Sequence, residues 1–263
     1  MRENALKRLW AEDKPALGGW LTNPSSASAE VMARTGFDWI CIDTQHGLID
    51  YQMSVDMLRA ISTTDAVPIV RVPWNEPGII MKSLDAGAYG VIVPMVNTRS
   101  EAEAAVSYCR YAPHGVRSYG PARVVLYAGR DYFQHANETV LCIVMIETAQ
   151  ALENLDDILS VPGVDVAYIG PADLSVSLGF PPASYHEDPK YATAVQSVVD
   201  ACRRHGVMPG FHGGNPDNAR ARIAQGFRFV EVCEDTGALA RAAAADLSTV
   251  RGQGGPDVAE SQA

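Results

Sequence analysis

The chain has 263 residues, of which 47% are hydrophobic, and its formal net charge at pH 7 is −10. A chain of this length can bury one large hydrophobic core, so a single domain is the first expectation. The excess of acidic residues disfavours nucleic acids and anionic membranes as partners, because both carry negative charge, and therefore favours a small-molecule ligand.

The amino-terminal stretch MRENALKRLWAEDKP is charged throughout, and no run of about 18 apolar residues follows anywhere in the chain. These features predict a cytoplasmic protein without a membrane partner. Five cysteines occur without a CxxC pair. Three of them, Cys41, Cys142 and Cys233, lie within apolar runs, where reduced thiols are expected to pack as small hydrophobic side chains.

Eight strand-like runs alternate with amphipathic stretches along the chain, which predicts repeated strand–helix units and a parallel sheet. A helix at residues 2–12 is expected to precede them and to cap one end of the fold. The strand-like runs are residues 16–22, 37–43, 67–73, 89–95, 140–147, 165–170, 206–212 and 227–232. Eight such units close most simply into an α/β fold of the (β/α)8 TIM barrel type.

Two segments do not fit this repeat. Residues 113–138 are too many for an ordinary connection, so they are expected to form either a lid or an oligomer contact. Residues 251–263 have the composition of a disordered tail, and residues 1–250 are expected to form a single barrel domain.

Polar side chains occur where several of the predicted strands end. Asp43 and His46 follow the second strand, Arg71 the third, Glu147 the fifth and Asp173 the sixth. Active sites of TIM barrels lie at this end of the strands. A carboxylate pair from adjacent strands suits Mg²⁺ or Mn²⁺. Each acid alone is as well explained by a helix cap or a rim ion pair, but their joint placement favours a catalytic site.

Carbon–carbon bond chemistry next to a ketone requires an enolate, which is stabilised by a Schiff-base lysine or by a metal. The expected places of the four lysines exclude the first route. Lys7 and Lys14 precede the barrel, Lys82 lies in a helix, and Lys190 lies in a loop. The metal route remains, with Arg71 supplying fixed positive charge at the developing oxygen.

Five segments together resemble the HpcH/HpaI class II pyruvate aldolases. They are DTQHG, VPIVRVPWNEPGIIMKSLDAGAYGVIVPMV, RSYGPAR, MIET and GVDVAYIGPADLSVSLG, and the likeness runs from about residue 16 to 240. The resemblance is to the 4-hydroxy-2-oxo acid and hydroxyketoacid aldolases of the family. It implies a TIM barrel assembled as a homo-hexamer of dimers with an exchanged helix, and a place in aromatic compound catabolism.

The resemblance also implies the reaction. A 4-hydroxy-2-oxo acid is cleaved reversibly to pyruvate or hydroxypyruvate and an aldehyde, with Mg²⁺, Mn²⁺ or Co²⁺ stabilising the enolate. By the same likeness, Glu147 and Asp173 hold the metal and Arg71 holds the keto or enolate oxygen. His46 is the acid–base group, and Asp43 supports it and orients its ring.

Further roles follow from the resemblance and from the predicted strand ends. Asp85 matches a carboxylate that reaches the histidine region from a neighbouring subunit. Backbone amides around Gly170, Pro171, Ala172 and Asp173 are expected to receive the substrate carboxylate.

Two aromatic residues at strand ends, Trp20 and Phe211, are expected to form apolar walls of the acceptor pocket, with Phe211 setting its size. His212 belongs either to an anion-binding turn or to an ordinary rim. Arg117 and Arg123 either hold an anionic substrate tail or form surface ion pairs.

Two other functions stay open on the sequence alone. A metal-dependent 2-oxo acid decarboxylase, or a phosphoenolpyruvate-type lyase or mutase, would use the same enolate without an aldol step. His46 favours the aldolase, because aldol cleavage needs proton transfer at an alcohol oxygen. A catalytically silent barrel that senses a metabolite is the third possibility, and the intact set of polar rim residues argues against it.

Overall fold

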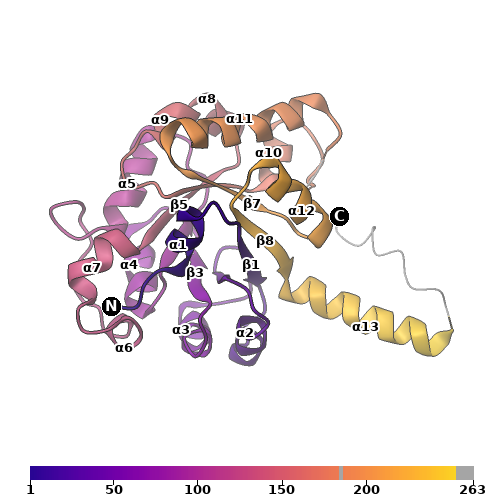
Figure 1. Cartoon of the computed structure of the whole chain (residues 1–263), viewed down its shortest axis with the longest axis horizontal. Helices are drawn as coiled ribbons and strands as arrows, with labels where there is room; N and C mark the ends of the chain where they lie inside the picture. Colours follow the sequence, from indigo (N-terminus) through magenta and orange to yellow (C-terminus); the bar gives the residue numbers. More distant parts are fainter. Residues whose placement is uncertain (184–185, 253–263) are drawn as a thin grey trace.

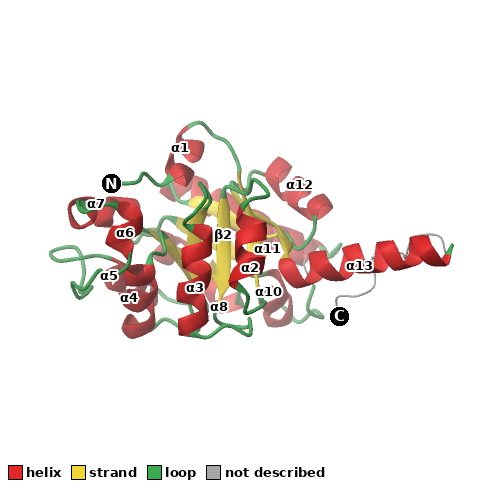
Figure 2. Ribbon diagram, turned by 90° about the horizontal axis from the view of Figure 1, so that it is seen from below, coloured by secondary structure: helices red, strands yellow, loops and turns green. Residues whose placement is uncertain are grey.

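The structure, a computed structural model, describes residues 1–183 and 186–252. Eight parallel strands close into one barrel in the order β1 to β8, which confirms the predicted (β/α)8 TIM barrel. Helices surround the barrel, as Figures 1 and 2 show. No helix among the described residues is long and apolar enough to cross a membrane.

Every predicted strand-like run contains a strand. The strands are β1 Ala16–Leu21, β2 Trp39–Asp43, β3 Val67–Arg71, β4 Gly90–Val93, β5 Leu141–Ile146, β6 Val166–Ile169, β7 Met208–His212 and β8 Phe229–Glu234. β8 extends two residues beyond its predicted end, and several other strands are shorter than predicted. The apolar pattern includes residues that flank the hydrogen-bonded ladder, so it locates a strand better than it locates its ends.

The helices form a discontinuous outer layer around the strands (Figure 2). They are α1 Ala5–Ala11, α2 Ser26–Ala33, α3 Tyr51–Ile61, α4 Pro77–Ala86, α5 Arg99–Cys109, α6 Val124–Ala128, α7 Tyr132–Thr139, α8 Ala149–Glu153, α9 Leu155–Leu159, α10 Pro171–Ser177, α11 Pro189–His205, α12 Pro216–Gln225 and α13 Asp235–Arg251. Of the predicted disordered tail, Arg251 ends α13 and Gly252 caps it, and residues 253–263 lie outside the described residues.

The sequence marks many of these helix ends. At the start of α5, the Thr98 side chain accepts from the Glu101 N–H while Glu101 accepts from the Thr98 N–H, which is a reciprocal capping box. α4 and α11 end at Gly87 and Gly206, whose φ angles of 117° and 68° favour glycine. The helix α1 begins at the Asn4 cap and confirms the predicted amino-terminal helix.

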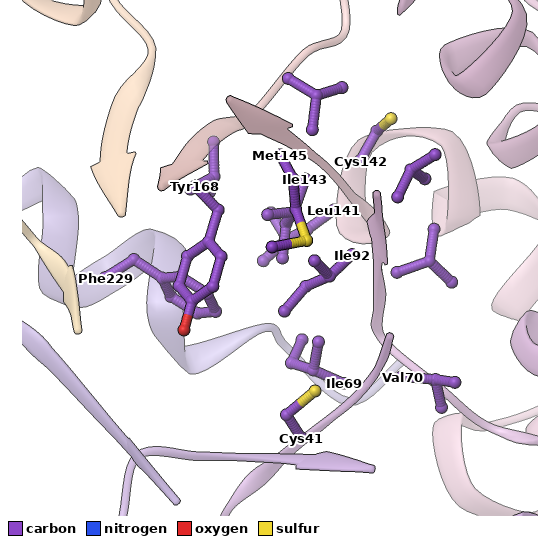
Figure 3. Close-up of a cluster of buried hydrophobic side chains, with 14 of the residues drawn as sticks. Cys41, Ile69, Val70, Ile92, Leu141, Cys142, Ile143, Met145, Tyr168 and Phe229 are labelled. Atoms are coloured by element: carbon purple, nitrogen blue, oxygen red, sulfur yellow. The ribbon is translucent and has the colours of Figure 1, made fainter. Parts of the chain in front are cut away.

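The strand register decides which side chains enter the barrel. Cys41 pairs with Ile69, and Asp43 with Arg71. Paired residues of neighbouring strands face the same side of a sheet, and successive residues alternate sides. Figure 3 shows part of the resulting core, in which Tyr168 lies among buried side chains from several strands. The register therefore places the rim polar residues above a filled apolar interior.

The long segment that contains α6 and α7 does not line the main cavity described below. It packs beside α4, where the Arg117 guanidinium donates to the Asp85 carboxylate at 2.7 Å and Arg123 donates to the Ala86 carbonyl at 2.6 Å. The segment therefore does not form a lid in this structure. Exposed apolar side chains on it, such as Tyr119 and Leu126, leave the oligomer contact as a prediction.

The helix α13 differs from the others because most of its length projects away from the barrel (Figures 1 and 2). Leu239, Leu247 and Val250 on this helix are exposed, and Asp235 is its only buried residue. A helix of 17 residues with so little burial lacks the packing that normally stabilises helices in proteins.

Candidate active site

One cavity of about 530 Å³ opens at the carboxyl ends of the strands. Its lining comes from the ends of β1, β2, β3, β5, β6, β7 and β8 and from the loops that follow them. Four segments of the lining carry predicted site residues. They contain Trp20, His46, Arg71 and Gly170–Asp173, respectively. These residues, far apart in the sequence, therefore share one cavity, as the barrel geometry requires.

Asp43 and Arg71 form a buried ion pair in two hydrogen bonds at the cavity wall. The Arg71 Nε donates to Asp43 Oδ1 at 2.8 Å, and its Nη2 donates to Oδ2 at 2.5 Å. Burial by itself raises the pKa of Asp43, but the hydrogen bonds and charge of Arg71 outweigh burial and hold that pKa below its usual value. The Trp20 ring lies 4.9 Å from the guanidinium. The two hydrogen bonds to Asp43 thus fix the orientation of the Arg71 guanidinium.

Asp43 also shapes the turn that presents His46. The backbone N–H groups of Gln45 and His46 donate to Asp43 Oδ1 at 3.0 and 3.3 Å. Asp43 therefore contacts His46 through the backbone, and none of the contacts in the described chain joins this carboxylate to the imidazole ring. The expected support of the ring by Asp43 stays a prediction. The His46 side chain is exposed and borders the cavity.

Glu147 lies behind the cavity wall, directly after β5, and is only 2% exposed. Its Oε1 accepts a hydrogen bond from the Met95 N–H at 2.7 Å. Burial raises the pKa of Glu147 to about 7, and the nearby charge of Asp173 acts in the same direction. A Cβ at position 170 would lie 2.2 Å from Glu147 Oε2, so the close approach of the carboxylate requires Gly170.

This carboxylate pair fits a hard divalent cation. Asp173, in the first turn of α10, borders the cavity, and its negative charge opposes ionisation of Glu147. A cation between them would favour ionisation of both acids. Within residues 1–183 and 186–252, no group of three or more potential ligand side chains gathers. A cation here would need substrate and water as its remaining ligands, which suits Mg²⁺ or Mn²⁺.

The lysines do not line the cavity. Lys7 lies in α1, Lys14 precedes β1 and Lys82 lies in α4, as expected. The expectation for Lys190 is wrong, because this residue lies in the first turn of α11, where its Nζ donates to the Leu178 carbonyl at 2.7 Å. None of the four lysines is therefore placed to form a Schiff base in the cavity.

The expected role of Phe211 is also wrong. Its side chain is fully buried on the outer side of β7, against Phe227 and Arg222, and does not line the cavity. The neighbouring His212 lines it instead, because successive residues of a strand face opposite sides. The expected role of Trp20 as a pocket wall agrees with its place in the lining.

Three other candidates lie away from the cavity of this chain. Asp85, Arg117 and Arg123 belong to the contacts between α4 and the long segment, so Arg117 and Arg123 have structural partners and do not reach a substrate in the cavity. The Arg117 side chain is fully buried. The proposed role of Asp85 concerns a neighbouring subunit and stays a prediction.

A second polar group at the cavity contains a buried acid, Glu231, that is not predicted from the sequence. Glu231 is fully buried in β8, and it is in register with His212 of β7. Tyr168 of β6 completes the group through its hydroxyl, 3.3 Å from His212 Nδ1. The available signal is an acidic residue inside the apolar run FRFVEV, where a buried carboxylate needs partners.

A TIM barrel whose carboxyl-terminal rim combines two acids, a fixed arginine and an exposed histidine has the features of an enzyme active site. The chain belongs to the HpcH/HpaI aldolase/citrate lyase family, because the profile of that family matches residues 17–242. This finding confirms the resemblance inferred from the five sequence segments.

Individual relatives agree with this placement. The chain is 43% identical over 248 residues to a hydroxypyruvate/pyruvate aldolase of Rhizorhabdus wittichii, covering 94% of this chain and 99% of that protein. It is 40% identical over 248 residues to a 4-hydroxy-2-oxo-heptane-1,7-dioate aldolase of Escherichia coli, covering 92% and 93%. A crystal structure of a family member from Burkholderia cenocepacia superposes with a TM-score of 0.88 at 35% identity, covering 95% and 100%.

Proposed function

We propose that the protein is a metal-dependent aldolase that reversibly cleaves a 4-hydroxy-2-oxo acid to pyruvate, or hydroxypyruvate, and an aldehyde. Membership of the family makes it a carbon–carbon lyase. One observation carries the proposal: a fixed Arg71, an exposed His46 and Asp173 line a single cavity, and the buried Glu147 lies close enough to Asp173 to feel its charge.

Cleavage requires two things of the protein: removal of the proton from the C4 hydroxyl and stabilisation of negative charge at the keto oxygen. The C3–C4 bond breaks, its electrons move into the enolate of the 2-oxo acid, and the proton of the C4 hydroxyl must leave as the aldehyde carbonyl forms. His46 takes that proton, because its exposed imidazole borders the cavity and a ring nitrogen can accept a hydrogen bond from the hydroxyl. The enolate then takes a proton at C3 to give the 2-oxo acid. The same steps in reverse join the two products.

The second requirement is stabilisation of the negative charge that develops on the keto oxygen, and Arg71 provides it. The Asp43 hydrogen bonds fix the guanidinium before the reaction, so little reorganisation is needed as the oxyanion develops. Glu147 and Asp173 would hold a Mg²⁺, Mn²⁺ or Co²⁺ ion, which supplies a Lewis acid for the 2-oxo acid when bound. The loop from Gly170 to Asp173 borders the cavity, and we assign the substrate carboxylate to its backbone amides.

We also propose that the enzyme is a homo-oligomer, with a hexamer as the expected state. The projecting α13 and its exposed Leu239, Leu247 and Val250 support this proposal, because a second subunit would bury them. Assembly is also required if Asp85 acts in a neighbour's site. Sedimentation should then show a species several times 28.3 kDa, and an active monomer would remove Asp85 from the site.

The cellular setting belongs to the same proposal. All five cysteines are free, which suits a reducing compartment such as the cytoplasm. Aromatic compound catabolism is the setting implied by the sequence resemblance. A decarboxylase or a phosphoenolpyruvate-type lyase or mutase is less suited to this cavity, because neither reaction needs the proton transfer at an alcohol oxygen that we assign to His46.

One experiment tests the function directly. Metal-loaded protein is incubated with pyruvate or hydroxypyruvate and a panel of aldehydes, and the adducts are identified by mass. We expect adducts that equal the sum of one donor and one aldehyde, because aldol addition loses no atoms. Carbon dioxide release without any adduct would support the decarboxylase instead.

A further inference from the structure

The cavity has a polar side that the proposed function leaves without a role. It is formed by the last residues of β7 and β8 and by residues that follow β8 and β1, across the closed barrel from β5 and Glu147. Its lining side chains are those of Thr22, Asn23, His212, Glu234 and Thr236. An apolar aldehyde would give none of these groups a hydrogen-bond partner, so the chemistry of this side indicates a polar ligand.

His212 is the best-defined group on this side. Its Nδ1 lies 3.3 Å from the Tyr168 hydroxyl and 3.9 Å from Glu231 Oε2, and the Trp20 ring packs edge-on against the imidazole at 4.8 Å. Burial lowers the pKa of His212 to about 4, and the charge of Arg71 acts in the same direction. His212 is therefore neutral at physiological pH.

The contact with Tyr168 is compatible with the Nε2–H tautomer of His212. In this tautomer the Tyr168 hydroxyl donates to Nδ1, and the ring proton lies on Nε2. Tyr168 and Glu231 are fully buried, whereas the His212 side chain is 28% exposed. The ring edge away from Nδ1 is therefore the edge available to a ligand, and it carries an N–H donor.

Glu231 lies beside His212 on the neighbouring strand. Its Oε2 accepts from the Gly214 N–H at 2.6 Å, which ties the carboxyl group to the loop after β7. Its Oε1 has no hydrogen-bond partner in the described part of the chain. Burial raises the pKa of Glu231 to about 7. With this pKa the carboxyl group is only partly ionised at neutral pH, so it adds less than a full charge beside His212.

A carboxylate limits what can bind on this side. Thr22 Oγ1 donates to Glu234 Oε1 at 2.8 Å and lies 2.8 Å from Thr236 Oγ1, so these three side chains form one network at the wall. Among the described residues that line the cavity, Arg71 is the only lysine or arginine, and Asp43 already pairs with it. A second anionic group on the substrate would meet Glu234 without a compensating cation.

We propose that the face formed by Thr22, Asn23, His212, Glu234 and Thr236 binds the aldehyde portion of the substrate and selects neutral hydroxyaldehydes over anionic semialdehydes. This inference rests on the proposed aldolase function. His212 donates from Nε2 to an oxygen of the aldehyde portion, while Glu234 and Thr236 accept from its hydroxyl groups. Tyr168 and Glu231 are positioning residues, because they act through His212.

The test compares matched acceptors with pyruvate as the donor. Values of kcat/KM, corrected for the hydrated fraction of each aldehyde, are measured for glyceraldehyde against propanal and for succinic semialdehyde against butanal. We expect glyceraldehyde to exceed propanal by about tenfold or more, since unpaired polar groups penalise the deoxy compound. Succinic semialdehyde should fall below butanal by a similar factor. A ratio near one in the first pair, or a preference for the semialdehyde, overturns the inference.

Variants assign the effects to residues. His212→Leu should lower the glyceraldehyde-to-propanal ratio by about tenfold, because the N–H donor is lost. Glu234→Gln should raise the semialdehyde-to-butanal ratio, because Gln can still accept from Thr22 but carries no charge. Phe211→Leu is the matched control: it changes the adjacent residue, which faces away from the cavity, so both ratios should stay at the wild-type values. Equal ratios in all three variants would contradict the assignment.

A second readout does not depend on turnover. In ¹⁵N NMR spectra of the whole protein, His212 should appear as the neutral Nε2–H tautomer at pH 7. Tyr168→Phe should shift it towards a mixture of tautomers, and an Nδ1–H tautomer in the wild type would contradict the proposed donor.

Exchange of pyruvate C3 protons with D₂O separates the proposed aldehyde selectivity from the proposed aldolase function. Exchange and adducts without selectivity would refute only this inference, whereas absence of both in the wild type would refute the aldolase function.

Discussion

Glu147 and Glu231 are two buried glutamates of one barrel with the same pKa, raised by burial to about 7, but with different surroundings. Glu147 lies beside the charged, exposed Asp173, so a cation bound on this side of the cavity would offset the repulsion between the two carboxylates. Glu231 lies beside a neutral histidine and is held by a backbone N–H. A raised pKa therefore does not by itself identify a metal ligand; the groups around the carboxyl decide its use.

Removing the metal, or either of its proposed ligands, should have the largest effect. Treatment with EDTA should abolish C3 exchange and cleavage, and Mg²⁺, Mn²⁺ or Co²⁺ should restore both. Glu147→Gln and Asp173→Asn should each lower cleavage by roughly 10³-fold or more, because fixed positive charge at the enolate oxygen is lost. Circular dichroism should show an intact fold. Full activity after metal removal would show that Glu147 does not act as a metal ligand in the reaction, and the proposed difference between Glu147 and Glu231 would fail.

His46→Ala should come next, with cleavage reduced by about 10² to 10⁴, the usual scale for a lost acid–base group. The deuterium exchange of pyruvate C3 protons should fall less, because enolisation does not need the proton of the C4 hydroxyl. The measurement is the ratio of cleavage rate to exchange rate. If His46→Ala cleaves at the wild-type rate, another group moves this proton.

Arg71→Ala should reduce exchange and cleavage together, by roughly 10² to 10³-fold, because both steps need the charge at the keto oxygen. Arg71→Lys keeps the charge but loses the two parallel bonds to Asp43, so it should recover only part of the rate. A variant that loses cleavage but keeps full exchange would show that Arg71 acts only in the aldol step.

Glu231→Gln should change the pH dependence of stability. Between pH 4.5 and 7 the unfolded carboxyl ionises while the buried one keeps its proton, so the wild type loses stability as the pH rises through this range. The variant lacks this loss and should gain up to roughly 3 kcal/mol relative to the wild type between pH 4.5 and 8. Urea unfolding of metal-free protein at both pH values measures the difference.

His212 works against Glu231 in this pH range. Its folded pKa of about 4 lies below the ordinary 6.5, so the wild type loses stability as the pH falls from 6.5 towards 4. Both proteins contain His212, and the comparison between them therefore isolates Glu231. A constant difference between wild type and Glu231→Gln across the range would mean that the buried carboxyl ionises normally.

Phe211→Leu should have the smallest effect. The side chain packs on the outside of β7 against Phe227, so its truncation should cost about 1 kcal/mol of stability and leave the cavity unchanged. Thermal unfolding and kcat/KM with several aldehydes measure the two quantities. A change in aldehyde preference would return Phe211 to the list of pocket residues.

The sequence by itself determines the framework of this protein. Eight apolar runs separated by amphipathic helices leave few alternatives to a parallel barrel, because each run must be covered on both faces. The strand ends at Asp43, Arg71 and Glu147 then predict the end of the barrel that carries the site. The apolar runs, the amphipathic stretches and the polar strand ends are local patterns. Such patterns predict the folded structure correctly when the tertiary packing favours the same local structure.

Only the tertiary structure decides which side chains meet. Phe211 and His212 are adjacent, and the sequence favours the larger aromatic residue as the pocket wall, but the register with β8 turns His212 inward and Phe211 outward. The same register brings Glu231 beside His212, although 18 residues of chain, which include the helix α12, separate the two positions. A one-residue shift in pairing would exchange the inward and outward sets, so the polar side of the cavity is fixed by strand pairing and barrel closure.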